Sequence, residues 1–100
     1  MNDLAARLAD LARCGKTTTY GALARDLGWR VSVLTTALEA LMEEDAAMGL
    51  PFRASLCEGR LSGGQPAQGF FLKAAQLGRP MGPDDVATER AALHSRALQE

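Results

Sequence analysis

Leucines recur at helical spacing at the start of the chain. Leu4, Leu8 and Leu11 follow the i, i+4, i+7 spacing that places side chains on one face of a helix. Asn2 is a suitable N-cap residue, and Gly15 is typical of a residue that closes a helix in the left-handed conformation. The pattern predicts an amphipathic helix over residues 2–13.

A short second helix is expected between the threonine run and Gly28. The β-branched threonines at residues 17–19 disfavour a continuing helix and favour a short extended segment. Thr19 is placed to cap the helix that starts at Tyr20. Because this helix spans only about two turns, it depends on tertiary contacts for its stability.

A third helix is expected from Val31 to about residue 42, with fraying of its acidic end before Gly49 because negative charge there opposes the macrodipole. Two helices joined by a tight turn at residues 28–30, with a further helix before them, form a helix-turn-helix. The residues of the third helix that share its expected apolar face are Val31, Leu34, Leu38, Leu41 and Met42.

The pattern changes after Pro51. Residues 52–58 read as a strand, and the glycine-rich residues 59–66 read as a polar loop, so together they predict a short β-hairpin wing. The segment from Phe70 fits a return strand or a short helix, and we favour the helix. Residues 79–82 are a linker, and Pro83 opens a final helix over residues 83–99, with an apolar stripe made by Val86, Leu93 and Ala97.

These elements predict one mainly helical α+β domain over residues 1–100, a winged helix-turn-helix with a core at residues 2–78 and an extra C-terminal helix. A length of 100 residues suits one domain. The net charge of -1 lacks the basic excess typical of tight nucleic-acid binders. Residues 11–83 nevertheless hold eight basic and six acidic residues, so the centre of the chain is mildly basic.

The two cysteines, Cys14 and Cys57, lie far apart with no zinc-ligand spacing, so we expect free thiols, no metal and no cofactor. The N-terminal stretch has acidic residues and no long apolar block, which predicts neither a signal peptide nor a membrane span. We therefore expect a cytoplasmic protein without a membrane partner.

Residues 15–24, Gly-Lys-Thr-Thr-Thr-Tyr-Gly-Ala-Leu-Ala, resemble the Gly-x-Val-x-Thr-Tyr-Gly-x-Ile-Ala pattern of alkylguanine-DNA alkyltransferases and alkyltransferase-like proteins. The resemblance extends through Gly28, Arg30, residues 50–53 and residues 59–64. It implies a winged-helix DNA-binding domain. Phe52 stands where the alkyltransferases carry the reactive cysteine of Pro-Cys-His-Arg, and Arg53 replaces the histidine.

Alkyltransferase-like proteins also lack this cysteine and bind DNA, with an arginine at the start of the recognition helix that fills the space of a flipped nucleotide. The resemblance gives that role to Arg30, although those proteins usually carry tryptophan at the position of Phe52. The run Pro66-x-x-Gly69-Phe70-Phe71 is also similar to small uncharacterised bacterial winged-helix proteins, and that similarity implies no function.

The first functional hypothesis is binding of double-stranded DNA without catalysis. Ser32, Thr35 and Thr36 would face base edges or phosphates if the third helix enters the major groove. Glu39 and Glu43 share that face and would repel phosphates. The residues expected to contact the DNA backbone are Arg30, Arg53, Arg60 and, through its hydroxyl, Tyr20, which also reads as a packing residue.

The second hypothesis is a protein-interaction module, because winged helices serve both uses. The final helix is expected to pack on its own core, and a homodimer through this helix is the alternative. Neither hypothesis includes catalysis: residues 59–64 lack the ending of a phosphate-binding P-loop, and no acid–base pair is evident. We expect Trp29 in the core and His94 on the solvent side of the last helix.

Overall fold

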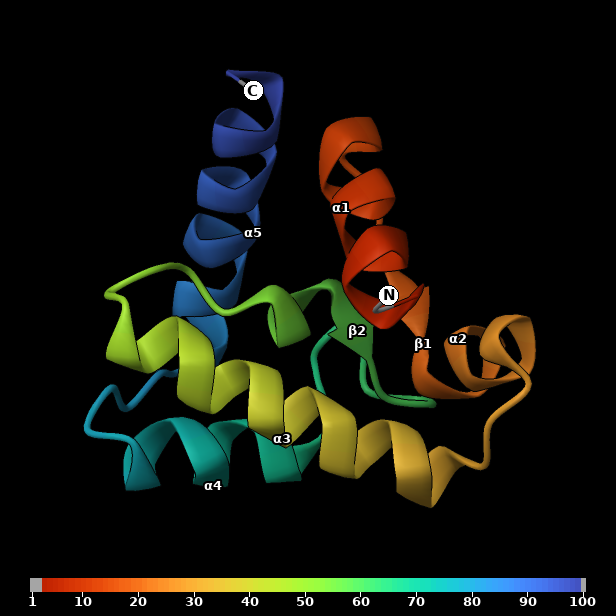
Figure 1. The fold of residues 1–100 in the computed structure, drawn as a ribbon. Coiled ribbons are helices and arrows are strands. Elements are labelled where there is room, and N and C mark those ends of the chain that lie inside the picture. The colour runs from red at the N-terminus through yellow and green to blue at the C-terminus, as the bar shows by residue number, and fades with distance from the viewer. Residues whose placement is uncertain (1–2, 100) are drawn as a thin grey trace.

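The leucine pattern near the N-terminus does form a buried helical face. In the computed structural model, which describes residues 3–99, Leu4 and Leu8 are fully buried in the first helix. The predicted N-cap Asn2 lies outside the described residues. The helices and strands of residues 3–99 are, in chain order, α1 (Asp3–Cys14), β1 (Thr18–Thr19), α2 (Tyr20–Leu27), α3 (Val31–Ala47), η1 (Arg53–Leu56), β2 (Cys57–Glu58), α4 (Gln68–Gln76) and α5 (Pro83–Leu98) (Figure 1).

The boundaries of α2 match those expected from the sequence. The Thr19 hydroxyl oxygen accepts a hydrogen bond from the Ala22 amide at 3.1 Å, which satisfies one of the free donors at the helix start. Gly28 ends the helix at φ 72°, a left-handed conformation that favours glycine. The mainly helical α+β class is confirmed, and residues 28–30 join α2 to α3.

Helix α3 begins at Val31 as predicted, but it ends later than predicted, and Val31 is exposed. It continues to Ala47, because Asp45 turns inward and is buried instead of fraying into solvent. The expectation that Val31 belongs to the apolar face is wrong, since 49% of its surface is exposed. Leu34 and Leu38, one and two turns further along, are buried as expected.

The predicted strand over residues 52–58 and its β-hairpin are not observed. Residues 53–56 form the 3-10 helix η1, and only Cys57 and Glu58 are extended. β2 pairs in parallel with β1, so that Thr18 lies opposite Cys57. Residues 59–67 form a loop of turns, and no return strand follows within residues 3–99 before α4 begins at Gln68.

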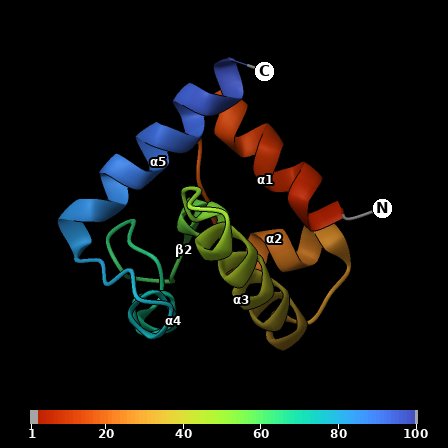
Figure 2. The ribbon, with the colours of Figure 1, turned by 60° about the vertical axis from the view of Figure 1, so that its left-hand side comes forward.

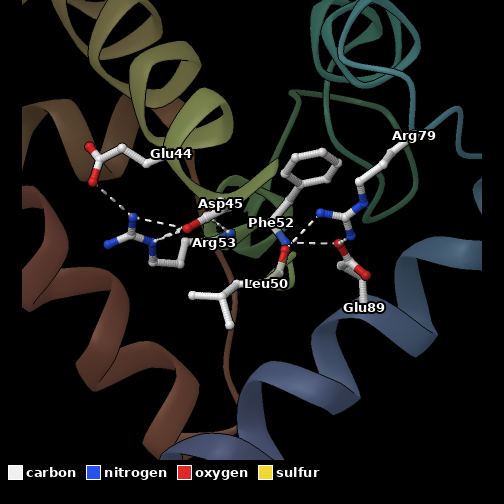
Figure 3. Close-up of polar contacts among 7 residues, drawn as sticks. All are labelled: Glu44, Asp45, Leu50, Phe52, Arg53, Arg79 and Glu89. Carbon is white, nitrogen blue, oxygen red and sulfur yellow. Dashed lines mark hydrogen bonds and ion pairs between the residues drawn. The ribbon is translucent and has the colours of Figure 1, made fainter. Parts of the chain in front are cut away.

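Hydrogen bonds from distant residues explain why this segment is not a strand. The carboxylate of Asp45 accepts the Arg53 amide at 2.9 Å, and its other oxygen accepts the Arg53 Nε at 3.0 Å (Figure 3). Asp45 is only 2% exposed, so this charge is paired inside the protein. A backbone amide held by a buried carboxylate is not free to join a β-ladder.

A second carboxylate holds the neighbouring residue from the other side (Figure 3). Glu89 of α5 accepts the Phe52 amide at 2.8 Å and the Arg79 Nη2 at 2.9 Å. Arg79 also donates to the Leu50 carbonyl at 2.7 Å, and its guanidinium carbon lies 4.1 Å from the centre of the Phe52 ring. We call Asp45, Arg53, Arg79 and Glu89 the polar clasp. It fixes residues 50–53 and leaves Phe52 fully buried in the core.

The C-terminal helix completes the same core. Val86 and Leu93 are buried with Leu4 and Leu8, and α5 packs against α1 and η1. The two helices converge where both end (Figure 2). The expectation that His94 faces solvent is wrong, because its Nδ1 lies 2.7 Å from the carbonyl oxygen of Ala12 at the end of α1.

The polar clasp predicts unequal roles for two adjacent acidic residues. Replacement of Asp45 by alanine leaves the Arg53 amide and guanidinium without their buried acceptor, so we expect the free energy of unfolding to fall by about 2–4 kcal/mol. Glu44, whose exposed carboxylate lies 3.9 Å from Arg53 Nη2, serves as the matched control, and Glu44→Ala should change stability by less than about 0.5 kcal/mol. Urea denaturation followed by circular dichroism measures both. Equal losses would contradict the assigned role of Asp45.

Candidate nucleic-acid interface

The first two turns of α3 form an exposed polar surface. Arg30 is the N-cap residue and is exposed, and no side chain caps the free amides of the first turn. Ser32, Thr35 and Thr36 follow, all exposed, and the first turn holds no acidic residue. Unpaired amides at a helix start carry partial positive charge, so this end of α3 favours an anionic partner. We call Arg30, Ser32, Thr35 and Thr36 the α3 face.

The hydroxyl groups of the α3 face are not equivalent. Thr35 Oγ1 donates to the Val31 carbonyl at 3.0 Å, and Thr36 Oγ1 donates to the Ser32 carbonyl at 3.1 Å. Both threonine protons are therefore used by the helix itself. The Ser32 hydroxyl makes no hydrogen bond to any other residue of the described chain and is the hydroxyl donor that is free for a ligand.

The carboxylates that follow the α3 face are partly neutralised. Lys73 of α4 binds Glu43 with an Nζ–Oε2 distance of 2.8 Å. The hydrogen bond that Lys73 donates to Glu43, and the charges of Glu43 and Glu39, raise the pKa of Lys73. The repulsion between Glu43 and phosphate that the sequence suggested is therefore weakened by a cation from another helix. Nothing in the spacing of the sequence indicated this pair.

Two of the predicted DNA contacts lie away from the α3 face. Arg53 follows the far end of α3, where Asp45 binds its guanidinium, so it is a structural residue of the polar clasp. Arg60 is exposed in the loop between β2 and α4 and has no ion pair within residues 3–99. In Figure 2 this loop lies on the left of β2, whereas the start of α3 lies on the right. Of the predicted DNA contacts, the structure therefore gathers the four residues of the α3 face, and Tyr20 lines the same hollow as Thr35.

Tyr20 has a structural role that its sequence position did not reveal. Its hydroxyl oxygen accepts the Ala67 amide at 3.0 Å, which ties the start of α2 to the start of α4. Burial raises the pKa of Tyr20. Trp29, in the turn between α2 and α3, is half-buried and packs against the core, which agrees with its expected structural role.

An apolar hollow of about 200 Å³ borders the α3 face. It lies between α3 and α4, and the exposed Val31 stands at its edge. The lining residues that carry polar side-chain groups are Tyr20, Thr35 and Glu39. The apolar side chains that line it are Val31, Leu38, Met42, Ala54, Ala67 and Phe70.

The thiols differ sharply in their surroundings. Cys14 is exposed, whereas Cys57 is fully buried, and burial raises the pKa of the Cys57 thiol to about 12. At neutral pH Cys57 is therefore protonated and a poor nucleophile. Within residues 3–99 no cluster of three or more histidine, cysteine or acidic side chains is arranged to hold a metal ion.

No helix of residues 3–99 has both the length and the apolar character needed to cross a membrane. Comparison of the chain with protein-family models, with curated protein sequences and with solved structures found no match in any of the three.

The buried thiol predicts a loss of stability in alkaline solution. The Cys57 thiol is neutral in both states below its ordinary pKa of 9.0, but above this pH only the unfolded chain ionises until the folded pKa of about 12 is reached. Between about pH 9 and pH 10.5 we expect the free energy of unfolding to fall by roughly 1–2 kcal/mol from this group. Tyr20, whose pKa is also raised, adds to the fall at higher pH.

Urea titrations at a series of pH values measure this dependence. Cys57→Ala should flatten the alkaline slope, whereas the matched variant Cys14→Ala, which removes an exposed thiol, should leave it unchanged. A slope that survives Cys57→Ala would show that the buried thiol is not its source.

Proposed function

We propose that this protein binds duplex DNA without catalysis, and that α2, the turn after Gly28 and α3 act as a helix-turn-helix. The observation that carries the proposal is the α3 face: an exposed helix start with one arginine, three hydroxyl residues and no carboxylate before Glu39. A helix start of this kind is suited to a phosphate, and exposed hydroxyls can contact phosphates or base edges.

Each residue of the α3 face has a distinct part in the proposal. Arg30 contacts a phosphate as a charged donor, and Ser32 adds the free hydroxyl. Thr35 and Thr36 contact bases mainly through their methyl groups and as acceptors, because their protons are bound to the helix backbone. With so few cations on this surface, we expect moderate affinity that decreases with salt.

Fluorescence anisotropy of a labelled duplex, titrated at several salt concentrations, tests the proposal. Arg30→Ala should weaken binding roughly fivefold at low salt, equivalent to about 1 kcal/mol for one ionic contact. It should also reduce the dependence of log K on log salt by about 0.9, the value for one lost phosphate contact.

Arg96→Ala is the matched control. It removes the same charge from an exposed position near the end of α5, which lies far from the start of α3 in Figure 1. This variant should bind DNA as the wild type does. Equal weakening by both substitutions would indicate binding through overall charge, and no binding at low salt would refute the proposal.

A protein-interaction module is the second candidate, and the apolar hollow beside the α3 face favours it. Its volume of about 200 Å³ is smaller than typical small-molecule pockets and suits one apolar side chain of a partner. The exposed Val31 at its rim would extend that contact. In this case Val31→Asp should abolish capture of a partner, whereas Arg30→Ala should retain it, and DNA should not bind either protein.

A further inference from the structure

A small hollow on another part of the surface carries basic side chains that the proposed function does not use. It has a volume of about 200 Å³ and lies between the end of α1, the segment before β1 and the middle of α5. Its charged or ionisable lining consists of Lys16, Arg90 and His94, and no carboxylate lines it. The remaining lining residues are Ala12, Gly15, Thr17, Leu56 and Ala91.

Arg90 is held in position but is not neutralised. Its Nε donates to the Ser55 carbonyl at 2.6 Å, which fixes the guanidinium beside η1. The two terminal nitrogens have no hydrogen-bond partner within residues 3–99, and Nη2 is buried. Arg90 also makes no ion pair with any of residues 3–99. A partly buried cation without a counter-charge is costly, because the lost hydration is not replaced.

The other two side chains complete a cationic wall. Lys16 is exposed and has no ion pair within the described residues, so its ammonium group is available. His94 is fixed against α1 by the contact between its Nδ1 and the Ala12 carbonyl, and its ring also covers the backbone of Gly15. The nearby Glu58, which does not line the hollow, is engaged by the Thr17 hydroxyl at 2.8 Å.

We propose that this hollow binds a phosphate group, with Arg90 and Lys16 as its charged donors. A phosphate supplies the acceptor oxygen that Nη1, the terminal nitrogen of Arg90 that is not among the buried atoms, lacks in the described chain, and two cations match its charge. The group can come from free phosphate or from a nucleic-acid backbone. The site shares no residue with the α3 face and does not depend on the proposed function.

The single histidine of the chain provides a direct probe, since it lines the hollow. Inorganic phosphate is added to the untagged protein at constant ionic strength and about pH 8, and the imidazole proton resonances are followed by NMR. In the wild type we expect a saturable shift with a midpoint in the roughly millimolar range, the affinity that a few ionic contacts allow. Chloride at equal ionic strength should not produce it.

Lys16→Gln should raise the midpoint at least about fivefold, and Arg30→Gln, the same loss of charge on the α3 face, should leave it unchanged. Both residues are exposed, so folding is not at risk. A parallel titration with a short duplex distinguishes the two sources of the phosphate. If the duplex shifts the resonances of the wild type and of Arg30→Gln but not those of Lys16→Gln, the site binds a backbone phosphate. If only inorganic phosphate shifts them, the site binds the free anion. No shift with either probe, or shifts that Lys16→Gln does not weaken, would overturn the proposal.

Discussion

The path of the chain after α3 depends on two carboxylates that bind backbone amides. Asp45 holds the amide of Arg53, and Glu89 holds that of Phe52. The two carboxylates belong to α3 and α5, and together they hold two consecutive residues of the chain. The Phe52 ring thereby enters the core, where its centre lies 5.9 Å from that of Phe70 in an edge-on contact. Since η1 and β2 follow directly, the position of the parallel pair with β1 is set by the same two contacts.

This constraint also divides α3 into two parts with different surroundings. Its end is occupied by the polar clasp, which uses Arg53 internally and buries Asp45. Its beginning is left with an arginine, hydroxyl groups and free amides facing outward. The sequence predicted a helix to about residue 42 with a fraying acidic end, whereas α3 is a structural anchor at its end and an accessible surface at its beginning.

Local signals in the sequence were sufficient for most helices. Signals that act within one helical turn marked the ends of α2 and the start of α5, and both helices were predicted correctly. These signals are the cap at Thr19, the glycine at residue 28 and the proline at residue 83. The predictions of a strand at residues 52–58 and of a wing were wrong. The amides of Arg53 and Phe52 bind carboxylates that lie 8 and 37 residues away in the sequence. The same applies to His94 and Tyr20, whose contacts lie 82 and 47 residues distant. For the candidate site, the sequence predicted the residues at the start of α3 but could not show that Arg53 is engaged elsewhere.

The packing of α5 on α1 has a consequence for how the protein acquires its structure. The contact between Ala12 and His94 joins residues 82 positions apart, and β1 and β2 pair across nearly forty residues. Contacts of such separation require closure of long loops before they contribute stability, which slows folding relative to bundles with local contacts. During synthesis, the face of α1 that carries Leu4 and Leu8 has no α5 to cover it until residues 83–98 have left the ribosome. The nascent chain therefore exposes the apolar face of α1 to solvent until α5 emerges, and transiently exposed apolar surface of this kind favours aggregation.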